Sequence, residues 1–175
     1  MKPPSQPPAT SPSRRPSPEA SEGVLPRRSI IQRVLAYRRL WILATVVYVL
    51  DQLTKGWIAG RLNYPTYGPP FHLPVIDGFF NLVHVGNTGA AWSILSGYGR
   101  LLGGFALLTL VAIFFWRKML GLRNPTVQWC FGGLCGGTVG NLTDRFRYGH
   151  VVDFLDFRFG SYAYPSFNVA DMGIV

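Results

Sequence analysis

Residues 137–175 read GTVGNLTDRFRYGHVVDFLDFRFGSYAYPSFNVADMGIV and contain four of the chain's eight acidic residues. These aspartates stand among Val, Phe, Leu and Tyr, close to segments that are apolar enough to lie in a membrane. A carboxylate near hydrocarbon is costly, so its presence favours a functional role. Two carboxylates brought together share one proton and can act as acid and base, and Asp153 and Asp171 are the candidates for such a pair.

The composition is typical of a membrane protein. Hydrophobic residues make up 48% of the 175 residues and charged residues only 14%, whereas about a quarter of an average soluble protein is charged. The net charge of +9 could indicate nucleic-acid binding, but most of the basic residues gather in residues 1–39 and 117–123, beside apolar segments. This distribution fits the positive-inside rule, so we expect no nucleic-acid partner and a cytoplasmic position for both regions.

The chain divides into a tail and a membrane-embedded domain. Residues 1–28 are rich in Pro, Ser and Arg, which predicts a disordered cytoplasmic tail because such a segment buries too little apolar surface to fold. Residues 29–175 form the domain. Its outer face is expected to carry residues 61–97 and 144–170.

Three apolar segments are long enough, or nearly so, to cross a bilayer as helices. They cover residues 40–60, 101–116 and 125–141. A fourth helix is expected to begin near Ala170, but only four residues follow Asp171. The fold class predicted is therefore an all-α membrane protein, a four-helix transmembrane bundle truncated in its fourth helix, with a small β element on the outer face.

The β element is predicted from two short strand-like pieces at residues 71–76 and 79–85, which turn signals separate. Residues 154–159, with Asp156 among them, are expected to form an amphipathic segment on the membrane surface with Asp156 facing water. Five glycines between residues 132 and 140 predict that the third helix packs closely against its neighbours.

Other polar residues near the expected spans are interpreted as structural. Asp51 and Lys55 share a helix face at i and i+4 and can form an ion pair. Asp144 and Arg145 are expected to pair with each other and tie the third helix to the following loop. Asn141 is expected to cap that helix or to bond across to another helix.

No metal or cofactor is expected. The cysteines Cys130 and Cys135 lie in an apolar stretch and are interpreted as small buried hydrophobes. The histidines His72, His84 and His150 are scattered, and none is assigned to catalysis. The sequence contains neither G-x-S-x-G nor H-E-x-x-H, so it lacks the signatures of α/β-hydrolase-type serine enzymes and of zinc metallopeptidases.

Five short motifs follow one another at consistent spacing: DQLTK at 51–55, NTGAA at 87–91, GNLTDR at 140–145, VVDF at 151–154 and FNVAD at 167–171. Together they resemble bacterial lipoprotein signal peptidase (signal peptidase II), and the resemblance covers roughly residues 40–175. Each motif is weak alone, whereas the ordered set is specific.

The resemblance implies a four-helix aspartic endopeptidase of the bacterial cytoplasmic (inner) membrane, a multi-pass protein with its N-terminus in the cytoplasm and its active site at the outer face. Such an enzyme removes signal peptides from diacylglyceryl-modified prolipoproteins, before the lipid-modified cysteine. The expected partners are this substrate and membrane lipid, and a monomer is expected. The catalytic residues implied are Asp153 and Asp171. The supporting residues implied are Asp51, Lys55, Asn87, Asn141, Asp144, Arg145 and Asn168.

Two other function classes stay open on the residues alone. In a small cation- or proton-coupled transporter the aspartates would bind ions, although transporter sites usually lie at the midplane of the membrane. In a non-catalytic scaffold the polar residues would join helices. For a peptidase we expect Asp171 to be the more acidic partner, because it would lie in the first turn of the fourth helix, where the dipole favours an anion.

Overall fold

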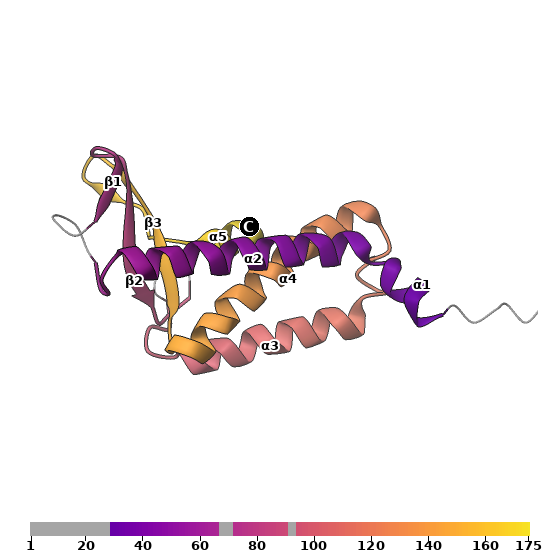
Figure 1. Cartoon of the computed structure of the whole chain (residues 1–175). Helices are drawn as coiled ribbons and strands as arrows, with labels where there is room; N and C mark the ends of the chain where they lie inside the picture. Colours follow the sequence, from indigo (N-terminus) through magenta and orange to yellow (C-terminus); the bar gives the residue numbers. More distant parts are fainter. Residues whose placement is uncertain (1–28, 67–71, 91–93) are drawn as a thin grey trace, which may run out of the picture.

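The computed structural model describes residues 29–66, 72–90 and 94–175, so the tail expected over residues 1–28 lies outside the described part. Long helices run side by side, a β-sheet lies at one end of them, and a short helix lies at the other end (Figure 1). In chain order the elements are α1 (Ile30–Leu35), α2 (Arg38–Arg61), β1 (Leu73–Ile76), β2 (Phe80–Asn87), α3 (Gly99–Trp116), α4 (Pro125–Tyr148), β3 (Val151–Phe159), β4 (Tyr162–Ala163) and α5 (Val169–Ile174).

Helices α2 and α3 are long and apolar enough to cross a membrane, in agreement with the first two spans expected from the sequence. Their exposed side chains are apolar, such as Leu53 at 65% exposure on α2 and Phe115 at 70% on α3. In α2 the buried side chains include Asp51 and Lys55. This arrangement, polar inside and apolar outside, reverses that of a helix in water and suits a lipid environment.

Helix α4 packs against α2, α3 and α5. It begins where the sequence predicts, because Asn124 accepts the backbone N–H of Thr126 at 2.9 Å and Pro125 occupies the first helical position. It ends at Tyr148, where Gly149 takes a φ of 77°. The helix is therefore about two turns longer than the span expected over residues 125–141.

The close packing expected from the α4 glycines is confirmed. A Cβ atom added to Gly136 would lie 2.5 Å from the carbonyl oxygen of Ala44 on α2. One added to Gly133 would lie 2.5 Å from the carbonyl oxygen of Gly173 on α5. Two adjacent faces of α4 thus touch the backbones of two other helices, which only glycine permits.

The sheet has the order β1-β2-β3-β4, and its paired strands are antiparallel. The hairpin expected from residues 71–85 is present as β1 and β2. The helical membrane fold with a β element is confirmed, and that element is a four-stranded sheet. The prediction of a surface-lying segment over residues 154–159 is wrong, because β3 runs through these residues and pairs with β2. Backbone bonds between Leu155 and Phe167, in both directions, then bring the start of α5 beside β3.

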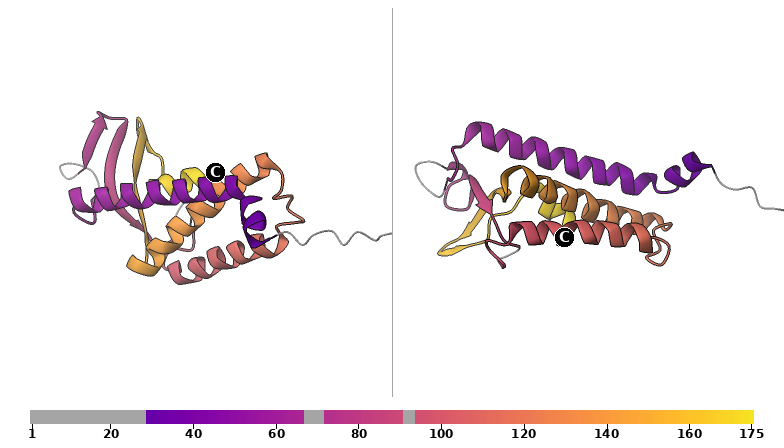
Figure 2. Two further views of the ribbon diagram at one scale, coloured as in Figure 1. Left: turned by 45° about the vertical axis from the view of Figure 1, so that its right-hand side comes forward. Right: turned by 90° about the horizontal axis from the view of Figure 1, so that it is seen from below.

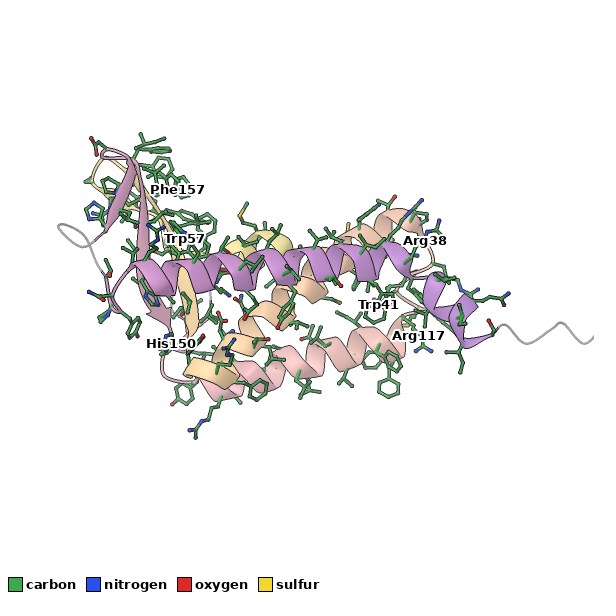
Figure 3. All side chains as sticks on the ribbon, viewed as in Figure 1. Arg38, Trp41, Trp57, Arg117, His150 and Phe157 are labelled. Carbon is green, nitrogen blue, oxygen red and sulfur yellow. The ribbon has the colours of Figure 1, made fainter. Side chains whose placement is uncertain are left out.

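The further views keep the sheet at one end of the long helices and α1 at the opposite end (Figure 2). Side chains follow the same division: Arg38, Trp41 and Arg117 lie at the α1 end, and Trp57 and His150 lie at the sheet end (Figure 3). Two separate apolar clusters fill these ends, one around Leu40 and one around Ile58.

Candidate active site

Asp153 lies on β3 and is only 2% exposed. Both of its carboxylate oxygens accept hydrogen bonds from amide side chains. Asn87, at the end of β2, donates to Oδ2 at 3.1 Å, and Asn168 donates to Oδ1 at 2.6 Å. The antiparallel pairing of β2 with β3 places Asn87 close enough for this contact, since Val85 is the register partner of Asp153.

Asp171 lies in the first turn of α5 and forms half of a capping box. Its Oδ2 accepts the backbone N–H of Asn168 at 3.1 Å, and the Asn168 side chain accepts the backbone N–H of Asp171 at 3.0 Å. Its Oδ1 accepts the Nδ2 group of Asn141, on α4, at 2.8 Å. The carboxylate is therefore held by donors from two elements.

Asn168 joins the two aspartates. It is fully buried, caps α5 with its oxygen, and donates its Nδ2 group to Asp153. Because one side chain contacts Asp153 and forms the reciprocal cap with Asp171, the structure brings together the two carboxylates that the sequence singles out. It also brings together Asn87, Asn141 and Asn168 around them.

The pKa of the Asp153 carboxyl is raised to about 7. Burial is the largest cause, because it disfavours the charged form, and the negative charge of Asp171 acts in the same direction. The hydrogen bonds from Asn87 and Asn168 and the charge of Lys55 oppose the rise. A carboxyl group that titrates near neutral pH beside a second carboxylate can hold and release the proton that an acid–base pair needs.

Lys55, Asp51 and Asp144 form a buried ionic cluster next to this pair. The ammonium nitrogen of Lys55 lies 2.8 Å from Asp51 Oδ2, which confirms the ion pair expected along α2, and 2.7 Å from Asp144 Oδ2 on α4. It also donates to Asn141 Oδ1 at 3.1 Å. Asn141 thus bonds to a residue of another helix, which was one of the two roles predicted for it.

The ion pair expected between Asp144 and Arg145 is not found in the part of the chain that the structure describes. Asp144 pairs with Lys55 instead. Arg145 donates to the carbonyl oxygens of Gly89 at 2.8 Å and Asn141 at 3.3 Å. Neighbouring residues of a helix point about 100° apart, which explains why the two side chains reach different partners.

Asp156 is only 5% exposed, so the prediction that it faces water is wrong. It accepts a hydrogen bond from Asn81 at 3.3 Å and pairs with Arg158 at 2.9 Å. Its partners lie on β2 and β3, and none of them contacts Asp153 or Asp171 through a bond found among the described residues.

Gln52 is a site residue that the sequence reasoning did not single out. Its Nε2 group donates to Asp51 and to Asp144, each at 3.1 Å, and so bridges α2 and α4. Its position inside the DQLTK stretch was the available signal. Residues 29–66, 72–90 and 94–175 contain no group of three or more His, Cys, Asp or Glu side chains able to hold a metal ion.

The fold and the site define a class of protein: a helical membrane protein that holds two aspartates where its helices meet a four-stranded sheet. A solved structure of the same fold is that of a bacterial membrane enzyme, obtained by the in meso method at 2.3 Å resolution. It superimposes with a TM-score of 0.68 at 32% identity, covering 77% of this chain and 79% of that one. Residues 43–175 match the model of the family described as signal peptidase (SPase) II. The chain belongs to this family of aspartic peptidases.

Curated relatives agree with the family. The lipoprotein signal peptidase of Nostoc punctiforme is 42% identical over 140 residues, covering 78% of this chain and 82% of the relative. That of Xanthomonas euvesicatoria pv. vesicatoria is 41% identical over 145 residues, with 78% and 79% covered. That of Desulforapulum autotrophicum is 37% identical over 142 residues, with 78% and 84% covered.

Proposed function

We propose that this protein is a membrane aspartic endopeptidase that removes signal peptides from prolipoproteins, with Asp153 and Asp171 as its catalytic pair. The relatives named lipoprotein signal peptidase support the substrate class. The observation that carries the catalytic assignment is the buried contact between the two carboxylates through Asn168, combined with the raised pKa of Asp153.

The chemistry follows from the two environments. Asp153 carries the shared proton, and Asp171 carries the negative charge in the first turn of α5, where the helix end favours an anion. Asp171 takes a proton from a water molecule whose oxygen bonds to the scissile carbonyl carbon, while Asp153 gives its proton to the carbonyl oxygen. When this gem-diol intermediate collapses, Asp171 gives its proton to the leaving nitrogen, Asp153 takes a proton back from a diol hydroxyl, and the C–N bond breaks.

The neighbouring side chains hold this pair in place. Asn87 and Asn168 fix the Asp153 carboxyl from β2 and from the cap of α5. Asn141 fixes Asp171 from α4. Arg145 keeps the carbonyl oxygen of Gly89, two residues after the end of β2, close to α4. These residues act as supports for the catalytic pair.

The substrate is a prolipoprotein whose cysteine carries diacylglycerol, and the bond cleaved is the one before that cysteine. The apolar outer surfaces of α2 and α3 allow the lipid to stay in the bilayer while the peptide reaches the aspartates at the sheet end. Family membership supports this assignment.

The orientation follows from charge. The α1 end of the molecule carries basic side chains and, in the described residues around them, no acidic ones. They are Arg38, Arg39, Arg117, Lys118 and Arg123. The positive-inside rule places this end in the cytoplasm, with residues 1–28 as a cytoplasmic tail before the domain, and the aspartates at the outer face of the inner membrane. Helices α2, α3 and α4 would be membrane spans, with α5 packed against α4, and a monomer is the proposed working form.

The test is cleavage of a purified prolipoprotein by the purified chain in detergent. The diacylglyceryl-modified substrate should yield a product whose mass places the new N-terminus at the modified cysteine. The same protein without the lipid is the control and should be cleaved far more slowly. A chelator should leave the rate unchanged. Absence of cleavage, with ion flux in reconstituted vesicles, would favour the transporter reading instead.

A further inference from the structure

Lys55 occupies an unusual position between two carboxylates. It is 4% exposed, and its ammonium nitrogen lies 2.8 Å from Asp51 and 2.7 Å from Asp144. A buried charge needs such partners, because an unpaired ammonium or carboxylate out of water is strongly unfavourable. Removal of Lys55 would leave two buried anions facing each other without their shared cation.

Each of these two carboxylates also holds the backbone just before one of the catalytic aspartates. Asp51 Oδ1 accepts the N–H of Ala170 at 2.9 Å, and Ala170 precedes Asp171. Asp144 Oδ2 accepts the N–H of Val152 at 3.2 Å, and Val152 precedes Asp153. Asp171 lies on α5 and Asp153 lies on β3. Lys55 pairs with both Asp51 and Asp144, the two carboxylates that bond to the backbone before these aspartates.

A third contact reaches the pair through a side chain. Lys55 donates to Asn141 Oδ1 at 3.1 Å, which turns the amide so that its Nδ2 group faces Asp171 at 2.8 Å. Asn168 supplies a second donor to Asn141 Oδ1 at 3.2 Å. The same Nδ2 group of Asn168 also donates to Asp153. Lys55 is therefore the donor to Asn141 that does not itself bond to either catalytic aspartate.

We propose that Lys55 is a positioning residue that sets the spacing and orientation of the two aspartates by holding Asp51, Asp144 and Asn141 at once. This inference rests on the proposed catalytic function of the pair. Lys55 does not touch the reacting atoms. It acts through the backbone anchors and the Asn141 amide, so its loss should lower the rate of the chemical step and leave substrate affinity nearly unchanged.

The charges around the pair give a second readout. Asp153 interacts with the charges of Asp171 on α5 and Lys55 on α2, and Arg145 on α4 interacts with Asp153, Asp171 and Asp144. Asp51 and Asp144 are the carboxylates that pair with Lys55. The positive charge of Lys55 lowers the pKa of Asp153. Without Lys55 the neighbourhood is more negative, so Asp153 should keep its proton to higher pH.

The experiment compares full-length Lys55→Met with Leu122→Ala, using cleavage of a lipid-modified prolipoprotein in detergent. Leu122 is buried in the cluster at the α1 end, away from the aspartates, so its truncation controls for lost stability. We expect Lys55→Met to lower kcat about 100-fold with little change in KM, and to move the basic limb of the pH profile to higher pH. Leu122→Ala should lower Tm and leave the pH profile unchanged.

An unshifted pH profile for Lys55→Met, with a loss of kcat no larger than that of Leu122→Ala at matched Tm, would overturn the proposal. If Lys55→Met does not fold, Asp51→Asn decides, because it keeps the side-chain volume and the acceptor for the Ala170 N–H but removes the carboxylate charge that pairs with Lys55. An unchanged kcat for that variant would also overturn the proposal. In either case Asp153→Asn and Asp171→Asn would still abolish cleavage, whereas cleavage by those two variants would overturn the proposed function itself.

Discussion

The residues around Asp153 determine the pKa of its carboxyl group. Burial and the charge of Asp171 raise its pKa to about 7, against the hydrogen bonds from Asn87 and Asn168. If Asp153 must be protonated to donate to the substrate carbonyl, activity is present below this pKa and is lost above it. We expect kcat/KM to fall about tenfold per pH unit above pH 7. A rate that is flat from pH 6 to pH 9 would contradict this role for Asp153.

The same pKa makes a prediction about stability. The unfolded carboxyl has the ordinary pKa of 3.8, and the folded one about 7. Between these values the folded protein binds the proton and the unfolded chain does not, so the stability of the wild type falls as pH rises through this window. The full penalty above pH 7 is about 4 kcal/mol. Asp153→Asn removes it, so its Tm advantage over the wild type should grow from pH 5 to pH 8. An advantage that stays constant over this range would contradict the assignment of the pKa.

At the residue scale, the side chains singled out from the sequence lie together in the structure, but not all of their partners could be predicted. Asp153, Asp171 and Asn168 were recognisable from their motifs, and the structure brings them together. The partner of Asp144 could not be recognised in this way. Arg145 is its neighbour in the sequence, but Asp144 pairs with Lys55, which lies on another helix. Pairing between helices depends on their packing, which residue spacing along one segment does not reveal.

At the scale of elements, the contact between α4 and α5 fixes where Asp171 lies. A Cβ atom at Gly137 would collide with the carbonyl oxygen of Ala170 and would lie 2.9 Å from Ile174 Cγ1. We expect Gly137→Ala to destabilise the protein by about 1–3 kcal/mol and to lower kcat, since it displaces the turn that carries Asp171. Thermal unfolding and cleavage rates measure both effects.

Gly104→Ala is the matched control for this substitution. Gly104 lies on α3, and a Cβ atom there would meet nothing within 4 Å. Because alanine favours a helix over glycine, this variant should be as stable as the wild type or more stable by up to about 1 kcal/mol. Equal losses in the two variants would show that the α4–α5 contact has no special importance.

Elements were predicted well where apolar length decides and poorly where polar residues are buried. The positions where α2 and α3 begin were predicted from the residues where apolar segments begin, and the start of α4 was predicted from Pro125. Strand β3 was missed because residues 154–159 were interpreted as a surface segment with Asp156 facing water, whereas Asp156 is buried. The end of α4 was missed because the charged residues after residue 143 were taken to end the helix.

At the scale of the whole molecule, charge predicts orientation. The basic α1 end should face the cytoplasm and the sheet end the outside. In a background without Cys130 and Cys135, an introduced cysteine at Asp77→Cys should react with a membrane-impermeant maleimide in intact cells. One at Lys118→Cys should react only after permeabilisation. Both should be labelled in detergent, which controls for local burial, and the reverse pattern in cells would contradict the orientation.

The central claim is that Asp153 and Asp171 form the catalytic pair, and single-turnover cleavage of a lipid-modified prolipoprotein tests it most directly. Asp156→Asn is the matched control, since Asp156 is a buried aspartate on the same strand whose partners are Asn81 and Arg158. We expect Asp153→Asn and Asp171→Asn each to lower the rate at least about 1,000-fold, and Asp156→Asn to cleave at close to the wild-type rate. Near-normal cleavage by either of the first two variants, or an equal loss in all three, would contradict the claim.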